Sequence, residues 1–459
     1  MYKKQKYLHF IGIGGIGMSG IAEILKKQGY HVSGCDVSSS SKIIDHLKEI
    51  GCVIYKGHSP KHINDTDVLV YSSALDNKNP EIAEALKKGI PVIPRAIMLA
   101  EIMRTKHSVA VSGAHGKTTT TSMLSHILIE AGEDPSVIVG GVLKNSSTNA
   151  KLGSGELIIA EADESDRSLL YLNPSLAIVN NIDAEHLDTY KDLEDVKQTF
   201  RDFLARLPFY GKAFVGIDDP GVKSILPISH IPIVKYGMSN EADVRGEILE
   251  LEPTHSVFNV YSWKKNLGNI TINMPGKHNV HNALAAISVC LELDVSFEKI
   301  KNALASFKGI ERRFEFKGIF NGAEIFDDYG HHPTEIENTL KIARNRAKGQ
   351  LIVAFQPHRF TRTQKLWNEF VNLLANFEMD ELYLADIYPA SEKPIEGITS
   401  QNLINAIKKK SPNKKCFYFQ TFEELENRLK NKLANGDLLI TIGAGKLNQV
   451  GEILINSAY

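Results

Sequence analysis

The stretch Ser108-Val-Ala-Val-Ser-Gly-Ala-His-Gly-Lys-Thr-Thr119 joins a short β-branched run to a glycine-rich turn and to the start of a helical pattern. In a phosphate-binding P-loop, backbone N–H groups surround phosphate oxygens, a lysine meets the β- and γ-phosphates, and a hydroxyl group binds Mg²⁺. Lys117 and Thr118 suit those roles, although Val111 stands where the usual spacing has glycine. The stretch predicts a strand, a helix and, between them, a phosphate-binding loop of Gly113, Ala114, His115, Gly116, Lys117, Thr118 and Thr119.

Acidic side chains follow the next predicted strand, residues 157–160, in the run Glu161-Ala-Asp-Glu-Ser-Asp166. Ligands bind at the carboxyl ends of strands in open α/β sheets, and Mg²⁺ takes one or two carboxylates with water and phosphate oxygens. We therefore expect Glu161 to bind metal beside Thr118. A further strand, residues 177–180, leads to His186, a candidate ligand for a second cation. The alternative is a solvated acidic loop and a histidine that caps a helix.

A second glycine-rich loop lies near the N-terminus. Gly12, Gly14 and Gly17 form a G-x-G-x-x-G pattern between a predicted strand and a helical stretch, and Asp36 ends the following strand. Such glycines let the backbone approach a diphosphate at a helix N-terminus, and the acid can accept a ribose hydroxyl. The pattern predicts a diphosphate and a ribose without naming the base, so NAD and a nucleotide sugar are both candidates. A glycine-rich turn that serves only packing is the alternative.

The last third of the chain contains the polar runs Asp327-Asp-Tyr-Gly-His-His-Pro333 and Gln356-Pro-His-Arg-Phe-Thr-Arg362. Arg359 and Arg362 lie three residues apart, so one helical turn would place both guanidinium groups on one face. Arginine forks match the two oxygens of a carboxylate. These residues predict a carboxylate-binding site, with ordinary surface arginines as the alternative.

Length and charge limit the class of protein. At roughly 150 residues per domain, the 459 residues suggest about three domains. The net charge of -1 provides no basic field for nucleic acid or an anionic membrane. No secretory signal and no apolar run of about 18 residues occur, so we expect a cytoplasmic protein without a membrane span. The 4 cysteines are scattered singly, unlike those of a disulfide scaffold or a zinc site.

Short β-branched runs alternate with longer helical patterns, which is typical of parallel sheets covered by helices. The fold class is therefore α/β. Strands are expected at residues 8–11, 31–35, 68–71, 91–93, 108–112, 157–160, 177–180, 323–326, 351–355, 381–384 and 437–441. Helices are expected at residues 97–104 and 280–293, with mainly strands across 212–274 and a boundary near Ile310.

The motifs together resemble the Mur ligases of peptidoglycan synthesis over essentially the whole chain. The resemblance rests on eight segments in order: residues 9–20, 114–121, 161–166, 181–188, 276–279, 312–314, 328–333 and 356–359. It implies an N-terminal Rossmann-like domain for a UDP-sugar (1–107), a central P-loop ATPase with a mostly parallel sheet (108–310), and a C-terminal Rossmann-like domain that closes over nucleotide and amino acid (311–459).

The resemblance also implies an activity, in which ATP phosphorylates the carboxylate of UDP-N-acetylmuramate and L-alanine attacks the acyl phosphate, giving an amide, ADP and phosphate. It implies that Lys117, Glu161, His186 and Arg313 are catalytic, and that ATP is further held by His278, Asn279, Arg313 and Asp328. The UDP-sugar would meet Gly12, Gly14, Gly15, Gly17, Asp36, His58, Ser72 and Ser73. L-alanine would meet Tyr329, His331, His358, Arg359 and Arg362, and metal would meet Thr118, Glu161 and His186.

Three other interpretations are open at this point. A recycling ligase would join a whole tripeptide to the same sugar, although the run from Tyr329 to Pro333 favours alanine. A nicotinamide dehydrogenase would leave Lys117 and the acidic run after residue 160 without a role. A nucleotide-binding scaffold without activity would also fit the loops. We expect a monomer or a homodimer.

Overall fold

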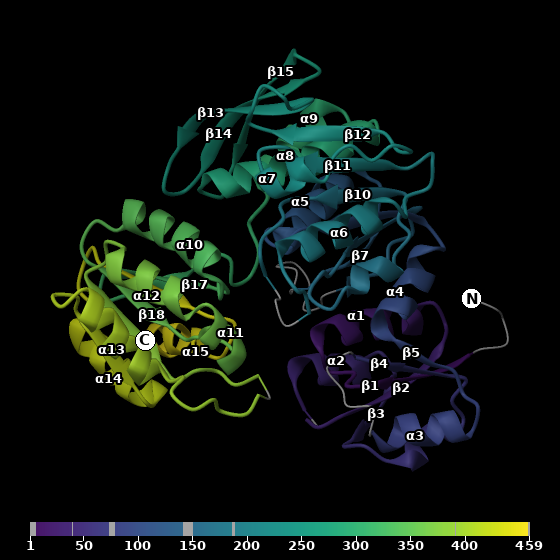
Figure 1. Ribbon diagram of the computed structural model, residues 1–459, viewed down its shortest axis with the longest axis horizontal. Coiled ribbons are helices and arrows are strands. Elements are labelled where there is room, and N and C mark those ends of the chain that lie inside the picture. The colour runs from purple at the N-terminus through teal and green to yellow at the C-terminus, as the bar shows by residue number, and fades with distance from the viewer. Residues whose placement is uncertain are drawn as a thin grey trace. The chain divides into compact units, whose positions relative to one another are not determined.

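The computed structural model describes residues 6–38, 40–72, 79–140, 150–185, 189–390 and 392–457 (Figure 1). Within these ranges the chain is a three-domain α/β fold built on separate, mostly parallel sheets. It divides into two compact units, one of residues 1–250, 256–273 and 277–308, and one of residues 251–255, 274–276 and 309–459. The described residues contain no helix that is both long and apolar enough to cross a membrane.

The first sheet is parallel, with the strand order β3-β2-β1-β4-β5. The order reverses beside β1, so the loop that follows β1 lies at the switch point where such sheets bind ligands. The elements are β1 (Tyr7–Ile11), α1 (Ile16–Lys27), β2 (His31–Asp36), α2 (Lys42–Glu49), β3 (Val53–Lys56), η1 (Pro60–Ile63), β4 (Val68–Tyr71), α3 (Pro80–Lys87), β5 (Val92–Pro94) and α4 (Arg95–Met103).

The second sheet has the order β15-β14-β13-β12-β11-β10-β6-β9-β7-β8, with a parallel run from β13 to β7. Helices α5, α8 and α9 pack together on it. The elements are β6 (His107–Ser112), α5 (Lys117–Ala131), β7 (Ser136–Ile138), β8 (Ala150–Lys151), β9 (Leu157–Glu161), η2 (Ser168–Tyr171), β10 (Leu176–Val179), α6 (Leu193–Leu204), β11 (Lys212–Gly216), α7 (Pro220–Ser224), β12 (Ile233–Gly237), β13 (Val244–Leu251), β14 (Ser256–Ser262), β15 (Lys265–Ile272), α8 (Lys277–Glu292) and α9 (Phe297–Ser306).

The third sheet has the order β16-β17-β21-β18-β19-β20, and only the edge pair β16–β17 among its described pairs is antiparallel. The elements are β16 (Glu315–Phe320), β17 (Ala323–Asp328), α10 (Pro333–Arg346), β18 (Leu351–Phe355), α11 (Phe360–Lys365), α12 (Trp367–Asn376), β19 (Glu381–Ala385), α13 (Ser400–Lys410), β20 (Cys416–Phe419), α14 (Phe422–Lys432), β21 (Leu438–Ile442) and α15 (Asn448–Asn456).

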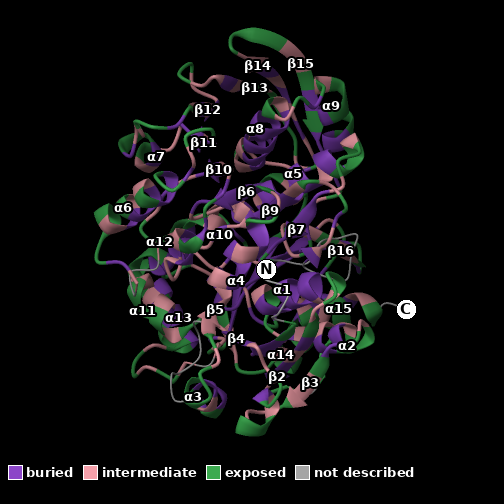
Figure 2. Cartoon of the chain, turned by 90° about the vertical axis from the view of Figure 1, so that its right-hand side faces the viewer, coloured by how far each residue is buried: buried purple, intermediate pink, exposed green. Residues whose placement is uncertain are grey.

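Strand β18 shows why continuous apolar runs become parallel strands here. Leu351, Val353 and Phe355 enter the core shared with α10, α12 and α13, whereas Ile352 and Ala354 enter the core shared with α14 and α15. All five residues are buried, because successive strand residues face opposite sides and helices cover both. In Figure 2 the interior strands β6 and β9 are likewise mostly buried, whereas helices such as α6 carry both buried and exposed residues.

The predicted strands are confirmed to within two residues at each end. The predicted helix at 97–104 begins two residues earlier, at Arg95, directly after Pro94. Strand β6 begins one residue before the predicted strand at 108–112, with His107, which pairs with Leu157.

Candidate active site

The phosphate-binding loop lies between β6 and α5, as the sequence predicts. Gly113 has a φ of 128° and Gly116 a φ of 80°, in a region that side chains with a Cβ rarely adopt. A methyl group at Gly116 would also stand 2.3 Å from Oδ1 of Asn282. Both glycines are therefore required by the backbone, and the loop leads into the N-terminus of α5, where a helix attracts anions.

Polar side chains from distant segments hold this loop. The N–H of His115 donates to Oδ1 of Asn181 at 2.8 Å, and the amide of Asn180 donates to the His115 carbonyl at 3.3 Å. Asn180 also donates to the Thr120 hydroxyl at 3.1 Å and accepts from the Tyr236 hydroxyl at 2.8 Å. The end of β10 therefore fixes the loop's shape before any nucleotide binds. The sequence motifs did not single out Asn180 for this role.

Lys117 is held by an ion pair with Glu164. Its Nζ lies 2.7 and 2.8 Å from the two carboxylate oxygens and donates to the Gly113 carbonyl at 2.6 Å. Burial disfavours the Lys117 ammonium, but the charges of Glu164 and Asp163 outweigh burial and raise its pKa. Burial raises the pKa of Glu164 to about 7, against the opposing effect of Lys117. Lys117 is thus a buried cation whose counter-ion a phosphate group can replace.

Thr118 and Glu161 come together where the sequence predicts a metal. The Thr118 hydroxyl hydrogen-bonds the Glu161 carboxylate, and burial raises the pKa of Glu161. Oε1 of Glu161 is buried and accepts no hydrogen bond within the described part of the chain. A hydroxyl beside a buried carboxylate oxygen that lacks a donor is the oxygen ligand set that Mg²⁺ takes. These two residues fit the ion.

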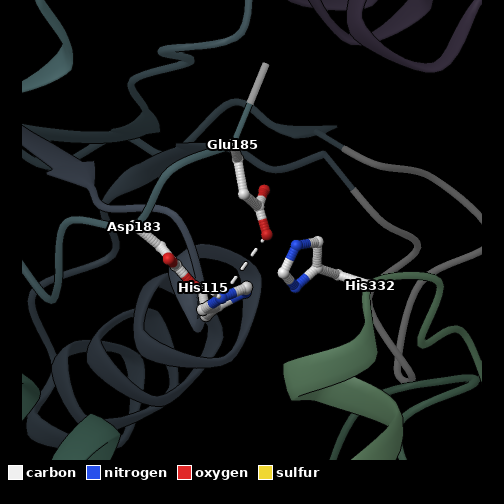
Figure 3. Close-up of side chains that lie close together, drawn as sticks. All are labelled: His115, Asp183, Glu185 and His332. Carbon is white, nitrogen blue, oxygen red and sulfur yellow. Dashed lines mark hydrogen bonds and ion pairs between the residues drawn. The ribbon is translucent and has the colours of Figure 1, made fainter. Parts of the chain in front are cut away.

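A second polar group lies beside the loop in the segment after β10. His115 points toward Asp183 and Glu185 (Figure 3), with its Nε2 3.2 Å from Oδ2 of Asp183 and 3.4 Å from Oε1 of Glu185. The sequence motif contained both carboxylates, but nothing in it indicated that they meet the loop histidine. His186, the predicted second metal ligand, lies outside the described residues, so its role stays a prediction.

His278 and Asn279 lie in the first turn of α8, and Asn279 is buried. One turn further along, Oδ1 of Asn282 accepts from the Thr120 hydroxyl at 3.3 Å. Because residues three and four apart share a helix face, His278 and Asn279 lie on the face of α8 that meets the phosphate-binding loop. Their predicted part in ATP binding is consistent with this position and stays a prediction.

The N-terminal glycine loop closes on the predicted acid. The N–H of Gly14 donates to Oδ2 of Asp36 at 3.0 Å, and a methyl group at Gly14 would stand 2.8 Å from the same oxygen. Gly12 has a φ of 74°, and Gly15 is the N-cap residue of α1. The structure therefore brings the glycines and Asp36 together at the carboxyl edge of the first sheet, as the motif predicts.

His58 belongs to a buried hydrogen-bonded network that the motifs did not reveal. Its Nδ1 lies 3.2 Å from Sγ of Cys35, which donates to Oε2 of Glu81 at 3.0 Å. Glu81 also contacts Nε2 of His9 at 3.2 Å and Nδ1 of His62 at 2.8 Å. Burial opposes ionisation of Glu81, but the hydrogen bonds from His9 and Cys35 lower its pKa to about 2. The network fixes the position of His58.

At the carboxyl edge of the first sheet, further polar residues follow strands β4 and β5. Ser72 directly follows β4, whereas Ser73 lies outside the described residues. Arg95, which no sequence motif singled out, begins α4 and reaches both Gly17 of the glycine loop and Asp163 of the acidic run. A lone arginine before a helical pattern carries no signal, because its contacts depend on how the two sheets are packed.

In the C-terminal unit, four predicted residues form one cluster. The ring of His331 lies 5.6 Å from that of Tyr329 and 5.8 Å from that of His358, centroid to centroid. Nη1 of Arg362 lies 3.0 Å from Nδ1 of His358. Burial, with the charge of Arg362 as a further cause, lowers the pKa of His331 to about 3 and that of His358 to about 4. Both imidazoles are therefore neutral at pH 7 beside a permanent cation.

The expectation that Arg359 and Arg362 share a helical turn is wrong. Helix α11 begins at Phe360, and Arg359 precedes it with a φ of 67°. The N–H of Arg359 donates to the Tyr388 carbonyl at 2.8 Å, while its own carbonyl accepts from the N–H of Thr363 at 3.1 Å. The bond from Thr363 is the first i to i+4 bond of α11, so Arg359 is the N-cap residue, and its non-helical backbone places it outside the helical turn.

Asp328 and Arg313 connect the start of the C-terminal unit to the end of β17. Oδ2 of Asp328 accepts from the N–H of Phe314 and Oδ1 from the N–H of Gly330, both at 2.8 Å. Burial raises the pKa of Asp328 to about 6, and Arg313 opposes the rise. Nη1 of Arg313 lies 3.7 Å from Oε1 of Glu335. Their contact with ATP stays a prediction.

Comparison with known families matches three models along the chain: "Mur ligase family, catalytic domain" at residues 7–107, "Mur ligase middle domain" at 111–290 and "Mur ligase, glutamate ligase domain" at 312–445. The fold of three α/β domains, with a phosphate-binding loop in the middle domain, agrees with these three family models. The chain belongs to the Mur ligase family.

Among curated relatives, the UDP-N-acetylmuramate–L-alanine ligase of Desulfatibacillum aliphaticivorans is 47% identical over 458 residues, 100% of both chains. That of Geobacter sp. (strain M21) is 47% identical over 99% of this chain and 98% of its own. The solved UDP-N-acetylmuramate–alanine ligase of Thermotoga maritima superposes with a TM-score of 0.81 at 25% identity, covering 98% of each chain. A murein peptide ligase of Psychrobacter arcticus superposes with a TM-score of 0.73 at 25% identity, covering 99% of this chain and 98% of its own.

Proposed function

We propose that the protein is an ATP-dependent ligase that joins the carboxylate of UDP-N-acetylmuramate to L-alanine in the synthesis of peptidoglycan precursors. The buried Lys117, poised at the phosphate-binding loop beside Thr118 and Glu161, is the observation that carries the proposal, because it supplies the charges that phosphoryl transfer needs. The full-length curated relatives with that name support the choice of substrates.

The reaction has two steps. A carboxylate oxygen of the muramyl group attacks the γ-phosphorus and ADP leaves; the amine of L-alanine then attacks the acyl carbon, a proton is lost and phosphate leaves. Both partners in the first step are anions, and Lys117 offsets their repulsion once Glu164 gives way to phosphate. Mg²⁺ held by Thr118 and Glu161 would supply further positive charge at the transferring group. Glu161 and Thr118 are therefore the metal ligands that we propose, with His186 for a second ion.

We propose that each domain takes one ligand: residues 1–107 the UDP-sugar, 108–310 ATP, and 311–459 the amino acid. The glycine loop with Asp36 and His58 supports the first assignment, and the loop from Gly113 to Thr119 supports the second. For the third, neutral His331 and His358 beside Arg362 offer a cation and hydrogen-bonding groups for an amino acid's carboxylate. That the protein is located in the cytoplasm, and that it is a monomer or a homodimer, stay predictions.

The deciding experiment is ADP release and product mass analysis with ATP, Mg²⁺, UDP-N-acetylmuramate and a mixture of amino acids. We expect continuing ADP release, over many turnovers, only when sugar and amino acid are both present, and a product heavier by one alanine residue. A parallel arm offers the murein tripeptide in place of L-alanine. Preference for the tripeptide, or ADP release without a new amide, would contradict the proposal.

A further inference from the structure

Arg95 lies between the two loops that would hold the anionic substrates. It follows β5 at the carboxyl edge of the first sheet and begins α4. A methyl group added at Gly17, in the first turn of α1, would stand 2.7 Å from Nη1 of Arg95. On its other side, Nη2 lies 3.8 Å from Oδ2 of Asp163 in the acidic run after β9. The same guanidinium therefore reaches the UDP-sugar loop and the loop beside Lys117.

The ion pair of Arg95 with Asp163 is long and leaves room for a second anion beside the guanidinium. The N-terminus of a helix carries partial positive charge, so a cation placed there is unfavourable unless an anion joins it. The Asp36 carboxylate accepts from the N–H of Gly14 just before α1, but the first turn of α1 contains no acidic residue, and no side chain caps the helix. The Asp163 carboxylate is 41% exposed, and at 3.8 Å it makes only a long, solvent-screened ion pair with Arg95. An anionic ligand at this point would satisfy the helix end and the guanidinium together.

UDP-N-acetylmuramate has anions at both ends of this path. Its diphosphate belongs at the N-terminus of α1, and its muramyl carboxylate must reach the γ-phosphate near Lys117. We propose that Arg95 is a substrate-binding residue that holds an anionic oxygen of the UDP-sugar, from the diphosphate or from the carboxylate. This inference rests on the proposed function of the two loops.

The test measures the affinity of the full chain for UDP-N-acetylmuramate by calorimetry, in the presence of Mg²⁺ and a non-hydrolysable ATP analogue. We expect Arg95→Ala to weaken binding by about ten- to hundredfold, the range of a charge-assisted hydrogen bond, while affinity for the ATP analogue stays within about twofold. Arg95→Lys should recover part of the loss. Arg104→Ala, at the exposed end of the same helix, is the matched control and should bind normally.

The variant Asp163→Asn distinguishes a role of Arg95 in ligand binding from a role in which Arg95 only stabilises the two loops. It removes the carboxylate that faces Arg95 but keeps the guanidinium. If Arg95 binds substrate, only Arg95→Ala lowers the affinity for the UDP-sugar. If Arg95 only holds the two loops together, both variants lower this affinity equally, and the inference is overturned. Unchanged affinity in Arg95→Ala would overturn it as well.

UDP-N-acetylglucosamine, which keeps the diphosphate and lacks the muramyl carboxylate, identifies the anion. If Arg95→Ala lowers the affinity for both UDP-sugars equally, Arg95 binds the diphosphate. If it lowers the affinity for UDP-N-acetylmuramate alone, Arg95 binds the carboxylate. The wild-type protein must also form the alanine amide. Failure of the wild type contradicts the proposed function, whereas an active wild type with a normally binding Arg95→Ala contradicts only this inference.

Discussion

At the scale of single residues, charge and burial decide what Lys117 does. We expect Lys117→Ala to lower kcat at least about a hundredfold, because a cation that stabilises the transferring phosphoryl group is lost. The fold should survive, since the partner Glu164, with its pKa raised to about 7, can take up a proton when its counter-ion is removed. Steady-state kinetics and thermal melting check both parts. Lys223→Ala, at an exposed ion pair in α7, is the control; a near-normal rate in Lys117→Ala would refute the role.

The buried histidines of the C-terminal cluster predict a pH dependence at the same scale. His358 has a folded-state pKa of about 4, below the unfolded value of about 6.5. Between these values the unfolded chain binds a proton that the folded chain does not, so stability is lost as the pH falls from about 6.5 toward 4. We expect His358→Gln to lose less stability than wild type over this range, measured by denaturant unfolding at several pH values. Parallel losses in both proteins would disprove it.

At the scale of one element, the two ends of α5 offer a matched pair of glycines. Gly116, before the helix, and Gly132, after it, both have positive φ, but only a methyl group at Gly116 meets another atom, Oδ1 of Asn282 at 2.3 Å. Either change to alanine should cost roughly 1 kcal/mol of stability from backbone strain. Only Gly116→Ala should also weaken binding of an ATP analogue, by about tenfold or more, because it displaces the loop. Calorimetry and melting separate the two effects, and equal nucleotide affinities would contradict the reasoning.

At the scale of the whole molecule, the C-terminal unit has a sheet with cores on both faces. We expect residues 309–459 to fold alone and to unfold cooperatively, measured by circular dichroism and urea denaturation. A shorter segment, residues 351–459, is the control: it lacks β17, which pairs with the interior strand β21, and should not fold. Cooperative unfolding of the shorter segment, or its absence in the longer one, would contradict this.

The sequence alone determined the α/β class, the strands on either side of both glycine-rich loops and the loops themselves, because a strand, a turn and a helix N-terminus are contiguous and their chemistry depends on neighbouring residues. It missed several strands, among them β3 and β20. Tertiary structure decided the rest. Glu164 as the partner of Lys117, Asn180 and Asn282 as supports of the loop, and Arg95 between Gly17 and Asp163 join segments distant in the chain. Strand order brings such residues together, and no local pattern encodes it. The short spacing from Arg359 to Arg362 also gave a wrong prediction, because Arg359 has a φ of 67° and helix α11 begins only after it, at Phe360.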